Sequence, residues 1–176
     1  PRIRQLIFEG KNKEAQELCG PAICSQSANG MPYQTVGTLH LDFEGISKYD
    51  DYYRDLDIEK AIATTRFTAN GVTYVRETFT SFPDRLLVIR LTASKKGSIS
   101  FTAHYTTPYT ENTEHRISSR NELQLNGKAN DHEGIEGKVR FTALTRIENN
   151  GGTLKATSDS TLQVKNANSV VLYVSI

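Results

Sequence analysis

The chain has 176 residues, 37% of them hydrophobic, and its 21 basic side chains nearly balance its 20 acidic ones. This composition is typical of one globular domain and argues against a disordered chain. The basic residues are scattered, so nucleic acid is not an expected partner. No apolar run approaches the roughly 20 residues that cross a bilayer, so a membrane is not expected either.

The chain opens with a helical pattern. Apolar residues recur at helical spacing on both sides of Gly10, and the pair Gly20-Pro21 predicts the end of the second run. We therefore expect a helical segment over residues 1–20, either as a helical hairpin or as one bent helix. The polar stretch 22–35 predicts a loop that leads to a sheet.

Two cysteines, Cys19 and Cys24, lie on either side of Gly20-Pro21. They are near enough in sequence to form a disulfide, but two cysteines in a chain of this length do not make a disulfide framework. Free thiols are the favoured interpretation, and the pair does not decide the cellular compartment.

From residue 36 onward the hydrophobic pattern has a period of two. Leu39, Leu41 and Phe43 alternate with polar residues, and Leu56 and Ile58 alternate with acidic ones. Side chains of a strand point to opposite faces in turn, so both stretches predict antiparallel strands with one face buried.

The pair Asn70-Gly71 separates two strand-like runs, residues 63–69 and 72–79. Asn and Gly tolerate the positive φ that both central residues of a type I′ turn need, so this stretch predicts a tight β-hairpin.

Further strands are expected later in the chain, separated by Gly- and Asn-rich turns that include Asn126-Gly127. The expected ranges are 86–92, 98–105, 122–125, 139–148, 153–158, 161–164 and 170–176. Many short strands at this spacing predict a mainly β fold, an antiparallel β-sandwich over residues 36–176 that follows the short helical segment. The polar segments 106–121 and 130–138 are expected to be long loops, free to contact a partner.

Short strings in matching order and spacing cover nearly the whole chain. They are residues 1–11 with 14–15, 31–43, 53–58, 61–65, 70–79, 82–84, 88–93, 131–134 and 137–141. Together they resemble the N-terminal domain of glycoside hydrolase family 95, the α-L-fucosidase type.

The resemblance implies a fold and a parent protein. It implies that residues 1–176 form a single β-sandwich domain of the super-sandwich type, truncated because the family's opening strands precede the helical segment. The parent would be a hydrolase whose (α/α)₆ barrel follows this domain and cleaves terminal α-L-fucosyl linkages with inversion. This segment alone is then expected to be inactive.

The resemblance also implies partners. The first is the catalytic barrel of the same chain, a glycan substrate is a second, and no cofactor is expected. A secreted or periplasmic location is favoured for a glycan-degrading bacterial enzyme. Two alternatives stay open: an independent carbohydrate-binding module, or the same domain of an α-galactosidase or a glycan phosphorylase.

No catalytic or metal-binding residue can be assigned from the sequence. The densest titratable cluster, Asp131, His132 and Glu133 followed by Gly134, is a weak binding-site candidate. It lacks a second His or Cys at metal-ligand spacing, so a turn stabilised by Asp and Gly, or an interdomain contact, is favoured. The remaining histidines are isolated in the sequence and receive no role: His40, His104 and His115.

Several acidic side chains lie close together in the sequence. Among 20 acidic residues some pair will have a catalytic separation by chance, so the distance alone does not identify a catalytic pair. Inverting glycosidases use two carboxyl groups roughly 6.5 to 9.5 Å apart. The candidates worth naming are Asp42 with Glu44, Asp55 with Asp57 and Glu59, and Asp131 with Glu133. Alternating acids on a strand usually form its solvated face, and this is the favoured interpretation.

Tyrosines give a further indication of binding, because sugar rings stack on exposed aromatic faces. Tyr49, Tyr52 and Tyr53 are close together in sequence, and Tyr105 and Tyr109 flank the first long loop. Packing against the sheet or the barrel is the favoured role for these rings.

Overall fold

The structure is a computed structural model that describes residues 2–23 and 33–176. The chain divides into two units, Pro1–Gln34 with Asp131–Gly137 and Thr35–Asn130 with Lys138–Ile176. Most of the predicted loop 22–35 lies outside the described residues, and so does Cys24. The state of the cysteine pair therefore stays a prediction. Neither described helix is long and apolar enough to span a bilayer.

The N-terminal segment is a helical hairpin of α1 (Arg2–Phe8) and α2 (Asn12–Ile23). Each helix buries one side chain, Leu6 on α1 and Ala15 on α2. Gly10 separates them with a φ of 74°, a left-handed conformation that glycine adopts without a steric penalty. Of the two expected arrangements, the structure shows the hairpin.

The predicted end of the second helix at Gly20-Pro21 is wrong, because α2 continues through Pro21 to Ile23. The proline ring disfavours helical geometry in the preceding residue, partly because it clashes with the Cβ of that residue. The residue before Pro21 is Gly20, which has no Cβ. Pro21 also stands in the last turn of the helix, where its missing N–H removes few helical hydrogen bonds.

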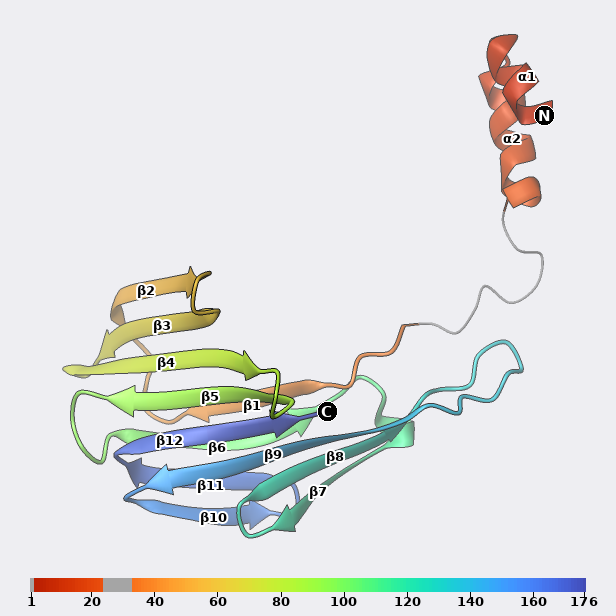
Figure 1. Cartoon of the computed structure of the whole chain (residues 1–176). Helices are drawn as coiled ribbons and strands as arrows, with labels where there is room; N and C mark the ends of the chain where they lie inside the picture. The colour runs from red at the N-terminus through yellow and green to blue at the C-terminus, as the bar shows by residue number, and fades with distance from the viewer. Residues whose placement is uncertain (1, 24–32) are drawn as a thin grey trace. The chain divides into compact units, whose positions relative to one another are not determined.

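The strands form two antiparallel sheets, which confirms the predicted sandwich (Figure 1). The four-stranded sheet has the order β1 (Thr38–Phe43), β6 (Ile99–Thr106), β11 (Thr161–Ala167), β10 (Thr153–Ser158). The eight-stranded sheet has the order β2 (Asp50–Asp57), β3 (Ile62–Ala69), β4 (Val72–Ser81), β5 (Leu86–Ala93), β12 (Ser169–Ser175), β9 (Arg140–Asn150), β8 (Glu122–Lys128), β7 (Thr113–Ser119).

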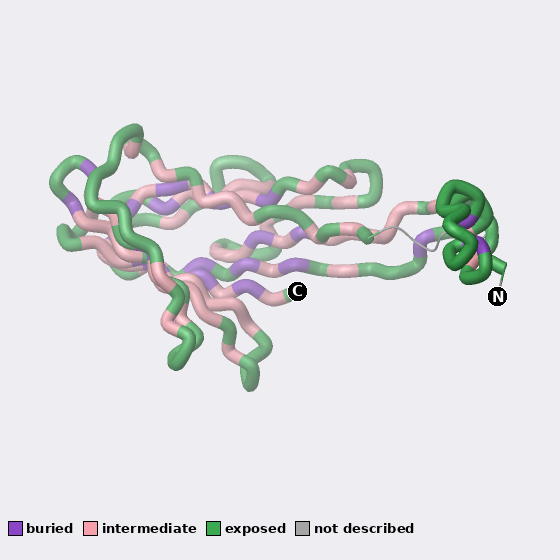
Figure 2. Tube along the Cα trace, turned by 90° about the horizontal axis from the view of Figure 1, so that it is seen from above, coloured by how far each residue is buried: buried purple, intermediate pink, exposed green. Residues whose placement is uncertain are grey.

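The hydrophobic core lies between the two sheets. Alternate residues of β6 (Ile99, Phe101 and Ala103) are inaccessible to solvent, as are Val164 on β11 and Leu172 on β12. Figure 2 shows the same alternation of buried and less buried positions along the strands. The period-two pattern of the sequence therefore arises because one face of each central strand meets the opposite sheet.

The hairpin predicted at Asn70-Gly71 is confirmed. Asn70 has a φ of 51° and Gly71 a φ of 72°, as a type I′ turn requires. Ala69 of β3 is paired with Val72 of β4 directly across this turn.

Two predictions near β8 are wrong. The predicted loop 106–121 contains strand β7, which pairs with β8 at the edge of the larger sheet. The predicted turn at Asn126-Gly127 is part of β8, where Gly127 stands opposite Phe141 of β9. A Cβ at position 127 would overlap the Phe141 ring, so glycine there provides space for a cross-strand aromatic side chain rather than a turn.

The two sheets differ in width. Strands β6 and β11 of the four-stranded sheet approach β5, β7, β8 and β9. In Figure 1 the four-stranded sheet forms the rear layer, and none of its strands lies behind β2, β3 and β4.

The uneven width explains why the predicted burial of Leu56 and Ile58 is wrong. Leu56 is paired with Ala63, so both point to the inner face of the larger sheet. Leu56 is nevertheless 63% exposed, and Ile58 follows the end of β2 and is 87% exposed. The alternation predicted the correct face for Leu56, but no described strand covers that face at β2.

Candidate functional site

The predicted cluster Asp131, His132 and Glu133 forms a tight turn. His132 and Ile135 exchange two backbone hydrogen bonds of 3.0 and 2.9 Å around Glu133 and Gly134, whose φ angles are 48° and 78°. The Asp131 carboxylate accepts a hydrogen bond from the Gly137 backbone N–H at 3.0 Å. This is the turn stabilised by Asp and Gly that the sequence favoured, and a binding role for the cluster stays a prediction.

Within that turn the His132 ring lies beside one carboxylate. His132 Nε2 is 3.8 Å from Glu133 Oε1, and both side chains are accessible to solvent. No group of three or more His, Cys, Asp or Glu side chains in the described parts of the chain could hold a metal ion.

The acidic pairs of the sequence are engaged in local contacts. Asp57 accepts hydrogen bonds from the backbone N–H groups of Lys60 and Glu59 at 3.0 and 3.1 Å, and from Lys60 Nζ at 3.1 Å. The Lys60 backbone bond is the main cause that lowers the pKa of Asp57. A general acid needs a raised pKa, so Asp57 has the opposite tendency.

The other predicted pair lies at the end of β1. Asp42 Oδ2 is 3.4 Å from His104 Nδ1. Glu44 accepts a hydrogen bond from Gln163 Nε2 at 2.9 Å and lies 3.8 Å from Lys165 Nζ. These contacts link the end of β1 to β6 and β11 of the four-stranded sheet and leave the carboxylates accessible to solvent.

Two histidines that are isolated in the sequence are neighbours in space. His40 on β1 and His104 on β6 are directly paired, and their rings stack with centroids 4.9 Å apart. His40 Nε2 is 2.8 Å from Thr106 Oγ1. The pairing depends on the register between two strands about 60 residues apart, which the sequence pattern does not provide.

Two of the predicted tyrosines belong to an aromatic row. The Tyr49 ring lies 5.7 Å from the Tyr52 ring and 6.1 Å from Phe67, and the Phe67 ring stacks on Tyr74 at 5.3 Å. Tyr53 is separate from the row, and its ring contacts the Arg66 guanidinium at 5.6 Å.

The Tyr105 side chain is buried in the core and is not exposed to solvent. Its hydroxyl hydrogen-bonds the buried Thr145 hydroxyl, and burial raises the pKa of the phenol. Tyr109 is half-buried at the start of the 3₁₀ turn Thr110–Asn112. Packing against the sheet, the role favoured from the sequence, therefore holds for Tyr105.

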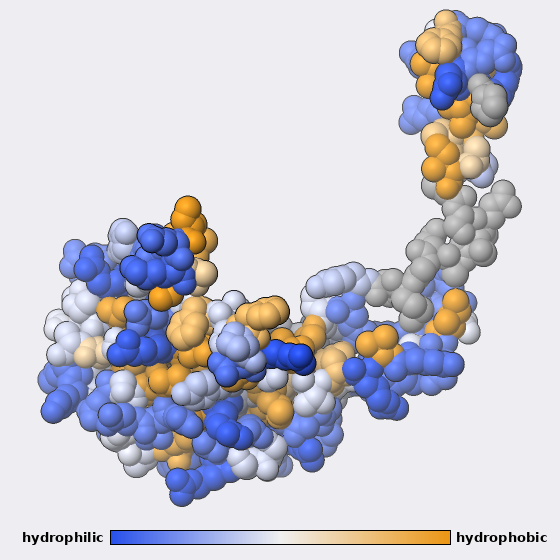
Figure 3. Space-filling model, viewed as in Figure 1, coloured by the Kyte–Doolittle hydropathy of each residue, from blue (hydrophilic) through white to orange (hydrophobic). Residues whose placement is uncertain are grey.

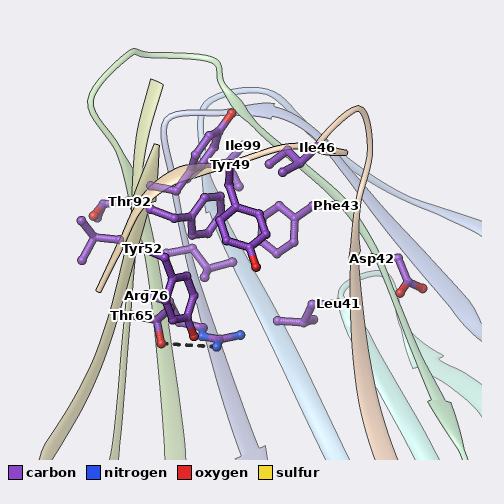
Figure 4. Close-up of a pocket in the computed structure, with 14 residues that line it drawn as sticks. Leu41, Asp42, Phe43, Ile46, Tyr49, Tyr52, Thr65, Arg76, Thr92 and Ile99 are labelled. Carbon is purple, nitrogen blue, oxygen red and sulfur yellow. Dashed lines mark hydrogen bonds between the residues drawn. The ribbon is translucent and has the colours of Figure 1, made fainter. Parts of the chain in front are cut away.

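The aromatic row lines a cleft of about 480 Å³ on the inner face of the larger sheet, which we call the open cleft. Leu41 and Phe43 of β1 form one wall, and Tyr49, Tyr52, Phe67 and Tyr74 lie around it (Figure 4). Leu91 and Ile99, which belong to the hydrophobic core, also line the cleft.

One basic side chain enters this apolar cleft. Arg76 Nη2 donates to Thr65 Oγ1 at 3.5 Å, and Figure 4 shows the Tyr52 side chain directed toward the same place. No sequence pattern singles out Arg76 or Phe67, because the cleft joins strands from β1 to β6 and its composition depends on the order of strands in the two sheets. The arrangement can bind an apolar group that carries an acidic or hydrogen-bonding function; it has no pair of facing carboxylates among the residues that line it.

The described strands form a β-sandwich with an aromatic cleft. The residues that line this cleft include no pair of carboxyl groups that could act as acid and base. The family model described as "Glycosyl hydrolase family 65, N-terminal domain" matches residues 1–176. The chain belongs to this family of glycoside hydrolase N-terminal domains. The family 95 assignment expected from the sequence is not confirmed by this match.

Two curated relatives carry fucosidase names. Alpha-L-fucosidase 2 of Arabidopsis thaliana is 27% identical over 197 residues, covering 97% of this chain and 22% of the relative. Probable alpha-fucosidase A of Aspergillus niger is 34% identical over 95 residues, covering 53% of this chain and 11% of the relative. The chain thus spans no more than about a fifth of the length of either relative.

Proposed function

We propose that this chain is the non-catalytic N-terminal domain of an inverting α-L-fucosidase of glycoside hydrolase family 95. The observation that carries the proposal is the similarity to Alpha-L-fucosidase 2, which runs along 97% of this chain but only 22% of that protein. The reaction would be hydrolysis of a terminal α-L-fucosyl linkage. Its acid and base would be supplied by a barrel elsewhere in the parent protein.

The role of the domain would be to pack against that barrel and support it. The outer face of the larger sheet offers a surface for this contact. Phe79, Val88 and Tyr173 are cross-strand neighbours on β4, β5 and β12 and form one apolar row. Figure 3 shows hydrophobic residues between hydrophilic ones over this sheet.

One charged pair lies beside this row, and a second continues it beyond Tyr173 on β9 and β8. Arg90 contacts Glu77 at 3.0 Å, and Arg146 contacts Glu122 at 3.1 Å. An apolar centre with a polar rim is the usual anatomy of a protein interface. Val88→Lys is expected to lower the melting temperature of the intact parent by several degrees while changing that of this chain little. An equal shift in both would argue against the contact.

The reaction is tested on the intact parent with a 2′-fucosylated saccharide, with and without inorganic phosphate. We expect release of free fucose that does not depend on phosphate, because water is the acceptor in hydrolysis. Release of β-fucose as the first anomer, seen by proton NMR, would support inversion at the anomeric carbon. No fucose release would remove the fucosidase assignment.

A glycan phosphorylase is the second candidate, favoured by the family 65 name of the matching model. Such a parent would transfer the glycosyl group to phosphate and yield a sugar phosphate. The comparison with and without phosphate separates the two when it is made on a saccharide that the parent accepts, since product formation by a phosphorylase would require phosphate.

A further inference from the structure

His40 and His104 form a stacked pair on the outer face of the four-stranded sheet. Leu39 and Leu41, on either side of His40, pack against the hydrophobic core, so the His40 side chain points to the opposite face. His104 stands directly across the strand pair on β6. The two imidazole rings have centroids 4.9 Å apart and lie only 8° from parallel. A positive charge on either ring therefore acts directly on the other.

The number of protons on this pair decides whether the rings attract or repel each other. Neutral imidazoles can stack, whereas two protonated rings carry like charges at short distance. Like charges directly opposite each other on neighbouring strands destabilise the pairing of those strands. Histidine ordinarily changes its charge between about pH 5 and 8, so acidification over this range adds both charges.

A carboxylate is recorded beside one of the two rings. Asp42 Oδ2 lies 3.4 Å from His104 Nδ1, so a positive charge on His104 has an opposite charge next to it. His40 Nε2 lies 2.8 Å from the Thr106 hydroxyl, which is uncharged. Among the described residues, no carboxylate has an ion pair with His40. A charge on His40 is therefore opposed by the charge on His104 without a carboxylate of its own.

The next strand of the sheet supplies no charge that would relieve this repulsion. β11 pairs with β6, and Thr161 stands opposite His104. Lys165 is the charged side chain of β11 on this face by the alternation of the strand; it is positive and lies 3.8 Å from Glu44. Asp159, in the turn before Thr161, has no ion pair with a histidine in the described parts of the chain.

We propose that the stacked histidine pair makes the pairing of β1 with β6 sensitive to acid. At neutral pH the stack holds the two strands together. When both rings are protonated, their repulsion loosens β1, which among the described strands pairs with β6 alone. Leu41 and Phe43 of β1 form a wall of the open cleft, so acid would widen the cleft on this side. The inference concerns this chain by itself and does not depend on the fucosidase assignment.

Hydrogen exchange of backbone amides in this chain tests the proposal. Protection factors, which are corrected for the intrinsic effect of pH on exchange, are compared at about pH 7.5 and about pH 5.0. We expect the protection of the β1 amides to fall at least about fivefold at the lower pH, because two unit charges repel at this separation. The amides of β10, the other outer strand of the same sheet, should change by less than about twofold. Equal protection of β1 at both pH values would overturn the proposal.

Two variants identify the groups that respond to pH. His40→Gln removes one of the two charges and keeps a hydrogen-bonding side chain beside Thr106, so its loss of β1 protection should fall below about twofold. His115→Gln is the matched control, because His115 lies in the other sheet opposite Leu125, and it should keep the full loss. The readout is the ratio of protection at the two pH values, which a variant that merely loosens β1 at both would leave unchanged. A full acid response in His40→Gln would overturn the proposal.

Discussion

The buried hydrogen bond between Tyr105 and Thr145 provides a sharp test of the core. Thr145 is fully buried and Tyr105 is 9% exposed, so neither hydroxyl can replace its partner with bulk water. Tyr105→Phe leaves the Thr145 hydroxyl buried without this partner, which costs about 1–3 kcal/mol. With a urea m-value of about 2 kcal/mol/M, the unfolding midpoint should fall by about 0.5–1.5 M.

A double-mutant cycle separates the lost hydrogen bond from other effects. Thr145→Val keeps the shape of the side chain. The double variant therefore removes both hydroxyls and leaves no buried hydroxyl without its hydrogen-bond partner. We expect the double variant to be destabilised by clearly less than the sum of the two single variants. Tyr53→Phe, at an exposed tyrosine, is the control and should be neutral. Strictly additive losses would refute the reasoning.

Three further predictions use urea unfolding of this chain. Gly127→Val should cost about 1–3 kcal/mol, because its side chain would overlap the Phe141 ring, and an unchanged midpoint would contradict the packing. Leu56→Ser should be nearly neutral, whereas Leu123→Ala, at a buried position, should cost about 2–5 kcal/mol; comparable losses would mean that β2 is covered in this chain. Asp57 has a lowered pKa when folded, so the stability it contributes is present above its ordinary value of 3.8 and is lost as the pH falls through the folded value. Asp57→Asn should therefore reduce the acid dependence of unfolding, and an identical pH profile would refute the assignment.

Local chemistry made much of the β-sandwich predictable. The hairpin at Asn70-Gly71 follows from two residues that accept positive φ, and the core strands follow from alternating apolar side chains. β7 was missed because it is an edge strand whose Ile117 is half-buried among polar residues. The signal available in the sequence was the alternation of Thr113, His115 and Ile117 with Glu114, Arg116 and Ser118.

The open cleft could not be predicted in the same way. Its residues come from β1 through β6, and they meet because β1 joins the second sheet instead of pairing with β2. The stack of His40 on His104 likewise depends on a register between distant strands. Periodicity predicts which face a side chain occupies, but it does not predict which strand covers that face, and Leu56 shows the difference.

Release of free fucose from a 2′-fucosylated saccharide tests the central claim most directly, using three proteins side by side. These are the intact parent, the parent without the segment that corresponds to residues 1–176, and this chain alone. We predict fucose from the intact parent, none from this chain, and a strong loss in the shortened parent, whose proposed barrel would lack the domain that supports it. Fucose release by this chain alone, or full activity of the shortened parent, would contradict it.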